Sequence, residues 1–317
     1  MDVIMTSPRL AAEAVALLEG AGARIHYMEP FPTPEAIATL ARSVGAVAIL
    51  SRQGPVTAAV MEAAPNLRVV ARHGVGVDDV DVAEALRRGI IVTRAPGSNT
   101  RAVAEHTIAM ILALAKRLPK LSAQVAAGEW RRGNDMVRDV AGLRLGLVGL
   151  GSIGQAVARF AAGFGMEVAA YTRSPGSPGS NDVRRMPDLP ALLARSDVLS
   201  LHLPYSSAAR HMIGRAELAM LPAEAIVINT ARGGLIDETA LLEALENGHL
   251  SGAGLDVFEG EPPALDSGLR RHPAVIATPH VSGVTEGSLV TMGVMAAECI
   301  VAVLTGRPVP AGRLVQA

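Results

Sequence analysis

Short apolar runs alternate with helical patterns along most of this 317-residue chain, and this alternation constrains the fold more than any other feature. In the first third, the apolar runs begin near residues 2, 24, 46 and 67. A second series begins near Leu143 and continues to Gly283. Strands that alternate with helices predict parallel sheets with helices on both faces. We therefore expect an α/β protein of two Rossmann-like, doubly wound parallel-sheet domains with a cleft between them.

The length of the chain and a change in its helical pattern near residue 97 predict how these domains divide the chain. At roughly 100 to 200 residues per domain, two domains are expected. After residue 97, a helical pattern over residues 101–127 is much longer than the helices before it, which predicts a domain crossing. We expect a discontinuous domain of residues 1–96 plus 284–317 and an inserted domain of residues 97–283.

Charge and cysteine content exclude several classes of protein. The 29 basic and 30 acidic residues leave no basic excess for a nucleic-acid binder that works by releasing counterions. The single cysteine, Cys299, can form neither an intrachain disulfide nor a thiolate metal site, which favours a reducing compartment. Asp2 stands where a signal peptide has basic residues, and the apolar run over residues 108–115 is shorter than a bilayer requires. We expect a soluble, cytoplasmic protein with no metal and with no nucleic-acid or membrane partner.

A glycine motif lies between a strand pattern and a helical pattern. Gly149, Gly151 and Gly154 form the spacing G-x-G-x-x-G. The first glycine makes a tight turn, the second lets the backbone approach a pyrophosphate, and the third lets helix and strand pack closely. The helix N-terminus then presents free N–H groups to the anion. In this context the motif predicts dinucleotide binding.

The end of the next strand predicts which dinucleotide is bound. About 20 residues beyond the motif stands Thr172-Arg173-Ser174, with no acidic residue to bind a ribose 2′-hydroxyl. A guanidinium beside hydroxyls can hold a 2′-phosphate, which an acid would repel. We expect these residues to bind the cofactor and to favour NADP(H). If Arg173 is instead a solvated charge at the start of the Ser/Gly/Pro-rich loop 174–182, NAD(H) is possible too.

Three later strand patterns are each followed by a chemically useful side chain. They are Arg232, Glu261 and His280, and ligands bind at the carboxyl ends of strands in open α/β sheets. Beside a nicotinamide, an arginine can grip a carboxylate and stabilise charge on a carbonyl oxygen, while a histidine supplies a proton. A carboxylate orients that histidine and favours its protonated form. Singly, each of these residues also fits a surface or packing role, but together they predict reduction of a carbonyl.

Five segments resemble signatures of one family, the D-2-hydroxyacid dehydrogenases, which include phosphoglycerate dehydrogenases and glyoxylate/hydroxypyruvate reductases. In family order they are VAEHT (103–107), GLGSIG (149–154), INTARGG (228–234), LDVFEGEPP (255–263) and TPHVSG (278–283). The resemblance implies that Arg232 binds substrate, that His280 donates the proton and that Glu261 is its partner. It also implies that the cofactor is contacted by Gly149, Gly151, Ile153, Gly154, Pro204, Thr230, Ala231, Asp256, Ser282 and Gly283. It further implies a homodimer built by the long helix after the crossing, a helix in which we expect Glu105 and His106 to pack against the cofactor domain.

The first domain resembles the family at a glycine loop whose backbone N–H groups hold the substrate carboxylate. Here that loop includes Val75 and Gly76, which we expect to bind substrate. Arg72 matches the phosphoglycerate dehydrogenase branch, whereas Asp79 replaces the family's usual Asn. Arg52 and Arg72, together with His73, could bind a second anionic group on the substrate, or they could be solvated loop charges.

These features predict an NAD(P)-dependent oxidoreductase that interconverts a small 2-oxo acid and a D-2-hydroxy acid. One alternative is a short phosphoglycerate dehydrogenase, or an enzyme for another hydroxy acid with a second anionic group. The chain ends at residue 317, so we expect no C-terminal regulatory domain. A formate or phosphite dehydrogenase is a rival within the fold, although Glu261 stands where formate dehydrogenases carry Gln. An alternative of another class is a dinucleotide-sensing binding protein resembling the corepressors of this fold.

Overall fold

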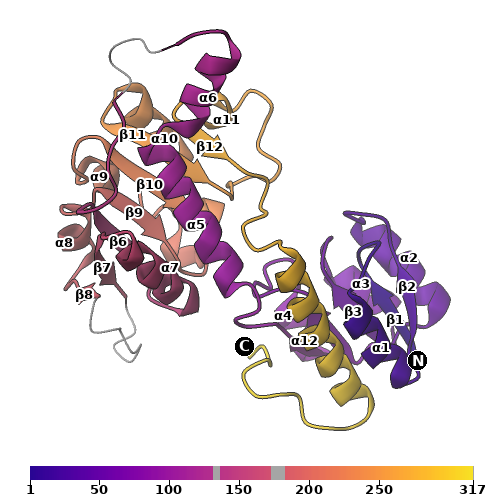
Figure 1. Cartoon of the computed structure of the whole chain (residues 1–317). Coiled ribbons are helices and arrows are strands. Elements are labelled where there is room, and N and C mark those ends of the chain that lie inside the picture. The colour runs from indigo at the N-terminus through magenta and orange to yellow at the C-terminus, as the bar shows by residue number, and fades with distance from the viewer. Residues whose placement is uncertain (131–135, 173–182, 317) are drawn as a thin grey trace. The chain divides into compact units, whose positions relative to one another are not determined.

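The computed structural model describes residues 1–130, 136–172 and 183–316, and the chain forms two compact units. Unit 1 comprises Met1–Asn99 and Val284–Ala317, and unit 2 comprises Thr100–Gly283 (Figure 1). The chain thus leaves unit 1 after Asn99, whereas the sequence placed this crossing at residue 97. Arg173, Ser174 and the rest of the predicted loop 174–182 lie outside the described residues.

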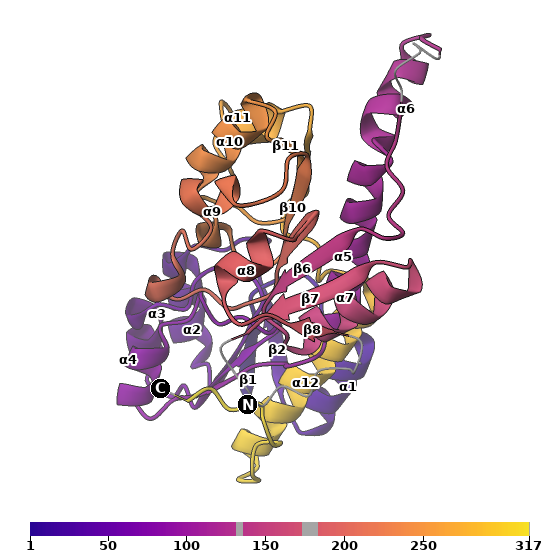
Figure 2. The same cartoon turned by 90° about the vertical axis from the view of Figure 1, so that its left-hand side faces the viewer.

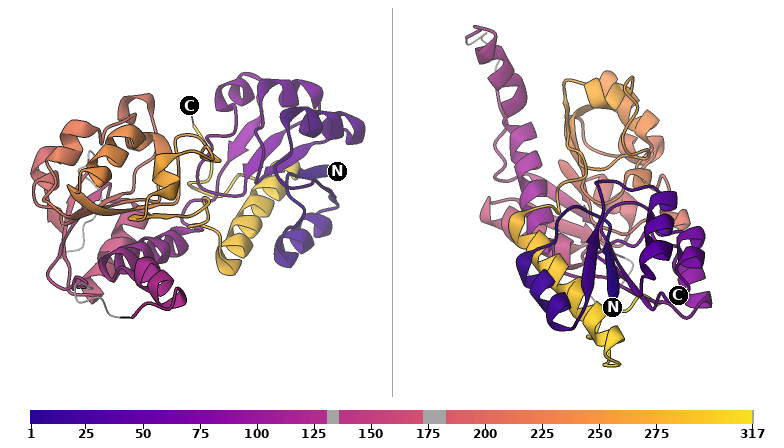
Figure 3. Two further views of the ribbon diagram at one scale, coloured as in Figure 1. Left: turned by 90° about the horizontal axis from the view of Figure 1, so that it is seen from above. Right: turned by 90° about the vertical axis from the view of Figure 1, so that its right-hand side faces the viewer.

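Unit 1 is built on a parallel sheet in the order β2-β1-β3-β4-β5. Its strands are β1 (Asp2–Met5), β2 (Arg24–Tyr27), β3 (Ala48–Ser51), β4 (Val69–Arg72) and β5 (Ile91–Thr93). Its helices are α1 (Ala12–Gly20), α2 (Pro34–Val44), α3 (Ala58–Ala63), α4 (Val82–Arg87) and α12 (Glu286–Leu304). One face of the sheet packs against α1 and α12 and the other against α2 and α3, as the left view of Figure 3 shows.

Helix α12 forms one layer of unit 1 together with α1. By length and hydropathy alone its 19 residues could cross a membrane, but half of the most apolar window is buried inside the protein. It packs against α1 and against β3, β4 and β5. These contacts account for its apolar composition as that of a core helix.

Unit 2 is built on a parallel sheet in the order β12-β11-β10-β9-β6-β7-β8. Its strands are β6 (Arg144–Val148), β7 (Glu167–Tyr171), β8 (Arg184–Arg185), β9 (Val198–Leu201), β10 (Ala225–Asn229), β11 (Leu250–Leu255) and β12 (Val275–Ala277). Its helices are α5 (Thr100–Ala115), α6 (Leu118–Ala126), α7 (Ser152–Gly163), α8 (Leu189–Leu193), α9 (Arg215–Ala219), α10 (Glu238–Glu246) and α11 (Gly268–Arg271), with short 3₁₀ turns at Ser207–Ala209 and Gly233–Leu235. Two parallel sheets with helices on both faces confirm the predicted fold class.

The prediction of a single long helix over residues 101–127 is wrong, because the helix is interrupted between α5 and α6. Arg117 has a left-handed backbone with φ of 50°, and α6 begins directly after it. Pro119 lies in the first turn of α6. A proline inside a continuous helix would lack an N–H and would clash with the preceding turn, so the helix ends and a second one begins.

The strand register of unit 2 brings three turns to one edge of its sheet. Asn229 of β10 pairs with Leu255 of β11, and Leu255 pairs with Ala277 of β12. The next residue along each strand therefore stands level with its neighbours at the carboxyl edge. The candidate catalytic residues lie on the three turns that start there.

Candidate active site

The glycine motif of unit 2 has the local geometry that pyrophosphate binding requires. Gly149 has φ of 98°, and a Cβ there would lie 2.3 Å from the His202 carbonyl oxygen. A Cβ on Gly154 would lie 2.4 Å from the Gly149 carbonyl oxygen, so helix α7 packs tightly on the turn. Gly151, by contrast, is exposed, and a Cβ there would meet no atom within 4 Å. Two glycines thus close the turn, and the third leaves room for a ligand at the N-terminus of α7.

The other predicted cofactor residues of unit 2 lie at the carboxyl edge of its sheet or just beyond it. Ile153 is in the first turn of α7, and Thr172 directly follows β7. Pro204 is exposed and lies three residues beyond the end of β9. Thr230 and Ala231 follow β10, while Ser282 and Gly283 lie on the turn after β12. A dinucleotide therefore fits this edge, because the glycine turn and these residues share it.

Glu261 and His280, predicted as a pair, are in direct contact. His280 Nδ1 donates to Glu261 Oε2 over 2.7 Å, and the side chains of His280 and Glu261 are 50% and 39% exposed. Glu261 Oε1 also accepts from the backbone N–H of Phe258 at 3.1 Å. Because Nδ1 is committed to Glu261, Nε2 is the ring atom left to exchange a proton with a ligand.

Opposing effects act on the Glu261 carboxylate. Burial raises the pKa of Glu261, but the hydrogen bond from His280 and the positive charges of His280 and Arg232 lower it, and the net shift is downward. Glu261 is therefore ionised at neutral pH. The ionised Glu261 accepts the Nδ1–H of His280 and so orients the imidazole.

The turn that carries Arg232 is held by a residue that sequence reasoning missed. Asn229 is 1% exposed, donates from Nδ2 to the Arg232 carbonyl at 2.8 Å and accepts at Oδ1 from the Ala231 N–H at 3.0 Å. A Cβ on Gly233 would lie 1.9 Å from the Phe258 carbonyl carbon. This glycine therefore lets the turn after β10 approach the turn that carries Glu261. An asparagine at a strand end before an arginine was the available signal.

Asp256, predicted to contact the cofactor, also holds a turn of the site in place. It is fully buried, Oδ1 accepts from the Val281 N–H at 2.9 Å, and Oδ2 accepts from the Ser282 N–H at 2.8 Å. Its carboxylate thus holds the turn that carries His280. Sequence reasoning gave it a cofactor role and missed this structural one.

Glu238 is a second residue that sequence reasoning missed near Glu261. Its Oε1 accepts from the Glu259 N–H at 2.6 Å, and Glu259 in turn contacts the side chains of Arg210 and His211. Burial and the nearby charge of Glu259 raise the pKa of Glu238, although the hydrogen bond from the Glu259 N–H opposes the rise. No sequence motif marks this support, because it joins three segments far apart in the chain.

In unit 1, Arg72 braces the predicted carboxylate-binding loop. Its Nε donates to the Gly76 carbonyl at 3.0 Å, and Nη1 donates to the carbonyls of Ser51 at 2.9 Å and Arg52 at 2.6 Å. Its Nη2 lies 3.1 Å from Asp79 Oδ2. Asp79, the departure from the family's usual Asn, thus supplies the carboxylate that pairs with Arg72.

Arg52 and His73 stand side by side on neighbouring strand ends of unit 1. The register pairs Ser51 with Arg72, so Arg52 and His73 follow on the same face of the sheet. Arg52 is half-buried and donates from Nη1 to Ser7 Oγ at 3.2 Å, and burial lowers its pKa. His73 is 6% exposed, and burial, followed by the charge of Arg52, lowers its pKa to about 4. His73 is therefore neutral at physiological pH.

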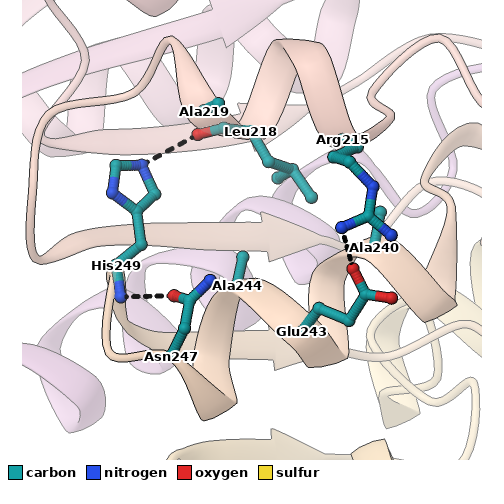
Figure 4. Close-up of a pocket in the computed structure, with 8 residues that line it drawn as sticks. All are labelled: Arg215, Leu218, Ala219, Ala240, Glu243, Ala244, Asn247 and His249. Carbon is teal, nitrogen blue, oxygen red and sulfur yellow. Dashed lines mark hydrogen bonds and ion pairs between the residues drawn. The ribbon is translucent and has the colours of Figure 1, made fainter.

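One cavity of unit 2 does not coincide with these groups. It has a volume of about 420 Å³ and lies between α9 and α10 of unit 2 (Figure 4). Figure 4 shows polar groups of its wall in contact with one another: Arg215 pairs with Glu243, the His249 ring bonds to the Leu218 carbonyl, and the His249 backbone N–H donates to Asn247. Within the described part of the chain, no group of three or more His, Cys, Asp or Glu side chains could hold a metal ion.

Unit 2 therefore has the fold of a dinucleotide-binding domain, with an arginine and a histidine–glutamate pair on neighbouring strand ends. This combination defines a class of proteins, the nicotinamide-dependent dehydrogenases with a histidine acid–base group.

Comparisons with known proteins identify the family within this class. Residues 108–282 match the model of the D-isomer specific 2-hydroxyacid dehydrogenase NAD-binding domain. The chain is 40% identical over 262 residues to a glyoxylate reductase of Korarchaeum cryptofilum, covering 81% of this chain and 79% of that protein. It is 35% identical over 310 residues to a D-3-phosphoglycerate dehydrogenase of Archaeoglobus fulgidus, covering 98% of this chain but only 58% of that protein. A solved structure of a Thermus thermophilus protein superposes with a TM-score of 0.91 at 37% identity, over 100% of both chains. The chain belongs to the D-isomer-specific 2-hydroxyacid dehydrogenase family.

Proposed function

We propose that this protein is an oxidoreductase that interconverts a small 2-oxo acid and a D-2-hydroxy acid with a nicotinamide dinucleotide. The observation that carries the proposal is the 2.7 Å contact between His280 and Glu261 on strand ends next to Arg232, within a dinucleotide fold. Family membership supports it, since a glyoxylate reductase and D-3-phosphoglycerate dehydrogenases are among the relatives.

The geometry supports a specific role for each residue. The bound cofactor supplies or accepts the hydride. The guanidinium of Arg232 grips the substrate carboxylate and stabilises negative charge on the carbonyl oxygen. His280 gives its Nε2 proton to that oxygen, while Glu261 accepts from Nδ1 and holds the ring in place. In the reverse direction the neutral His280 accepts the hydroxyl proton at Nε2.

We propose that the loop around Val75 and Gly76 of unit 1 provides backbone N–H groups for the substrate carboxylate. Arg72 then acts by holding this loop, since its donors are engaged by three carbonyl oxygens and by Asp79. Arg52 is the better candidate for a second anionic group on the substrate. Its side chain donates to the neutral hydroxyl of Ser7, and among the described residues no carboxylate forms an ion pair with it.

For the cofactor, we propose that NADP(H) is preferred over NAD(H). The strand end after β7 carries Thr172, Arg173 and Ser174 and no acidic residue, which suits a 2′-phosphate better than a 2′-hydroxyl. We also propose a homodimer in the cytoplasm. Helix α6 has no buried residue and extends away from the rest of unit 2 (Figure 2), and the one cysteine, Cys299, is buried and free.

One panel of assays tests the activity and the cofactor preference together. Glyoxylate, hydroxypyruvate, pyruvate, 2-oxoglutarate, phosphohydroxypyruvate and 3-sulfopyruvate are each offered with NADH and with NADPH. We expect reduction of at least one acid, to the D-isomer where the product is chiral, with a higher kcat/KM for NADPH. No turnover of any acid with either cofactor would count against the activity, and equal or better use of NADH would count against the cofactor preference.

A further inference from the structure

His280 has a backbone conformation that must be held in place by its surroundings. Its φ is 53°, in the left-handed region that residues other than glycine seldom adopt. Such a conformation is strained and persists only where other contacts enforce it. The backbone N–H of His280 donates to the carbonyls of Asp256 at 2.8 Å and Thr278 at 3.0 Å. Together with the carboxylate of Asp256 on the next two N–H groups, these bonds fix the direction of the imidazole.

A chain of hydrogen bonds leads from Asp256 to helix α5. Thr278 Oγ1 donates to Asp256 Oδ1 at 2.6 Å, and His106 Nε2 lies 3.1 Å from the same hydroxyl oxygen. A threonine hydroxyl has one proton, and here it points to the carboxylate. His106 must therefore donate from Nε2 to Thr278. The chain runs in one direction, from His106 through Thr278 to Asp256, and each donor polarises the next.

Thr107, the next residue of α5, is hydrogen-bonded to the turn that carries Arg232. Thr107 is fully buried, and its Oγ1 donates to the Val103 carbonyl at 2.8 Å. Its hydroxyl oxygen lies 3.0 Å from Thr230 Oγ1, so the proton between them comes from Thr230. Thr230 stands two residues before Arg232. Two successive residues of one helix thus contact the turns that carry the proposed acid and the proposed substrate-binding cation.

Helix α5 is well suited to this role because it is a continuous 16-residue helix that lies along β10 and β11 (Figure 1). A helix fixes the separation of two successive side chains, and strands β10 and β12 are both joined to β11 in register. The two turns are therefore tied at their strand ends and again at one place on the helix. A misplacement of about 1 Å in such a site can lower turnover roughly 100-fold.

We propose that His106 and Thr107 are positioning residues for the proposed reaction, His106 for His280 through Thr278 and Asp256, and Thr107 for Arg232 through Thr230. The kinetic effects expected below rest on the proposed function. The structural claim is that two adjacent residues of α5 position different catalytic groups. Loss of one bond should therefore change proton transfer, and loss of the other should change substrate binding.

The first arm of the proposal, the positioning of His280 by His106 through Thr278 and Asp256, is tested by Thr278→Val. This substitution keeps the shape of the side chain and removes its hydroxyl, and Thr278→Ser is the matched control. Thr278→Val should lower kcat for reduction roughly 10-fold or more. The alkaline limb of its pH profile should move to lower pH, because a displaced imidazole loses the stabilising contact with Glu261. His106→Phe should behave in the same way. Thr278→Ser should retain near wild-type kinetics.

The second arm, the positioning of Arg232 by Thr107 through Thr230, is tested by Thr107→Val, with Thr107→Ser as its control. We expect Thr107→Val to raise KM for the 2-oxo acid several-fold without moving the alkaline limb of the pH profile. Thermal unfolding of all variants gives the purely structural contribution. If the variants lose activity only in proportion to their loss of Tm, or if both arms change the same kinetic parameter, the proposal is overturned.

A readout that needs no turnover separates this proposal from the proposed function. The NMR signal of the His280 ring Cε1–H is assigned by its loss in His280→Asn. This signal should shift or broaden in Thr278→Val and stay unchanged in Thr107→Val. If the wild type reduces no acid, the proposed function fails while the NMR comparison still decides the positioning. An unchanged His280 signal in Thr278→Val would refute the role of His106 and Thr278.

Discussion

At the residue scale, the chemistry proposed for this protein depends on one imidazole nitrogen. His280 has Nδ1 bonded to an ionised carboxylate and Nε2 directed away from it, which is the arrangement that a proton donor requires. Another histidine–carboxylate pair, His26 with Asp2 at 2.9 Å, lies on the edge of the unit 1 sheet. The pair alone therefore does not make a catalytic site. The His280–Glu261 pair differs from the His26–Asp2 pair in lying at the strand ends beside Arg232, and this position supports the role proposed for it.

Replacement of His280 by Ala should lower kcat roughly 100-fold or more, because a positioned general acid contributes about that factor. The KM for the dinucleotide should change little, since the glycine turn is untouched. Steady-state kinetics on the best 2-oxo acid measures both. His26→Ala is the matched control, because it removes a histidine of similar pairing outside the site. Activity of His280→Ala within a few-fold of wild type would refute the assignment.

Replacement of Arg173 by Ala should raise the KM for NADPH roughly 10-fold or more and leave the KM for NADH nearly unchanged. A charge-assisted hydrogen bond to a phosphate contributes about 1.5 to 3 kcal/mol, and only NADPH carries the 2′-phosphate. The measurement is KM for each cofactor at a saturating 2-oxo acid. Arg270→Ala, on exposed α11, is the control for general loss of charge. Equal effects on both cofactors would contradict the 2′-phosphate argument.

At the element scale, apolar periodicity predicted the main strands and helices but not their interruptions. The runs before Gly149 and Arg232 are strands β6 and β10, which are mostly apolar because nearly all of their residues are buried. The run before His280 is the edge strand β12, which is only partly buried. The break at Arg117 was missed, although Pro119 marks it in the sequence. Glu238 and the structural role of Asp256 could not be predicted, because each depends on turns that meet only in the folded sheet. Asn229 was missed although its bonds are local to its own turn and its place before Arg232 was a usable signal.

Gly233→Ala tests how closely two of these turns must approach. The added Cβ would meet the backbone of Phe258, which cannot move aside as a flexible side chain can, so the Arg232 and Glu261 turns must separate. Overpacking of this kind costs about 1 to 3 kcal/mol. We expect a lower Tm and a kcat reduced roughly 10-fold or more. Gly163→Ala, where a Cβ meets nothing within 4 Å, should leave both unchanged. Wild-type kinetics in Gly233→Ala would show that this approach is unimportant.

At the scale of the whole molecule, acid should destabilise unit 1 through His73. The pKa of this histidine is about 4 in the folded protein, against an ordinary value of 6.5. Below the higher value the unfolded chain binds a proton that the folded unit does not, so stability falls as the pH falls through this window. The expected loss from His73 is roughly 2 kcal/mol between pH 7 and pH 5.

Urea unfolding at a series of pH values measures this loss, with tertiary structure of unit 1 as the signal. His73→Gln should flatten the pH dependence below pH 6.5, whatever its effect on stability at neutral pH. Above pH 7 the slopes of wild type and variant should coincide, which serves as the internal control. The same slope in both proteins below pH 6.5 would contradict a buried, neutral His73.

The assembly of the molecule is the last property that the surface of unit 2 predicts. Helix α6 has nine residues, none of them buried, and isolated helices shorter than about 12 residues are marginal in water. Leu118, Leu121 and Val125 fall on one face of it, and Leu118 and Val125 are 55% and 57% exposed. A second copy of this chain would cover that face. We therefore expect wild-type protein to sediment as a dimer and Leu118→Glu/Val125→Glu to sediment as a monomer in analytical ultracentrifugation. Leu265→Glu changes a leucine elsewhere in unit 2 that is 72% exposed, and it should leave the dimer intact. A monomeric wild type, or a double variant that stays dimeric, would exclude α6 as the dimer contact.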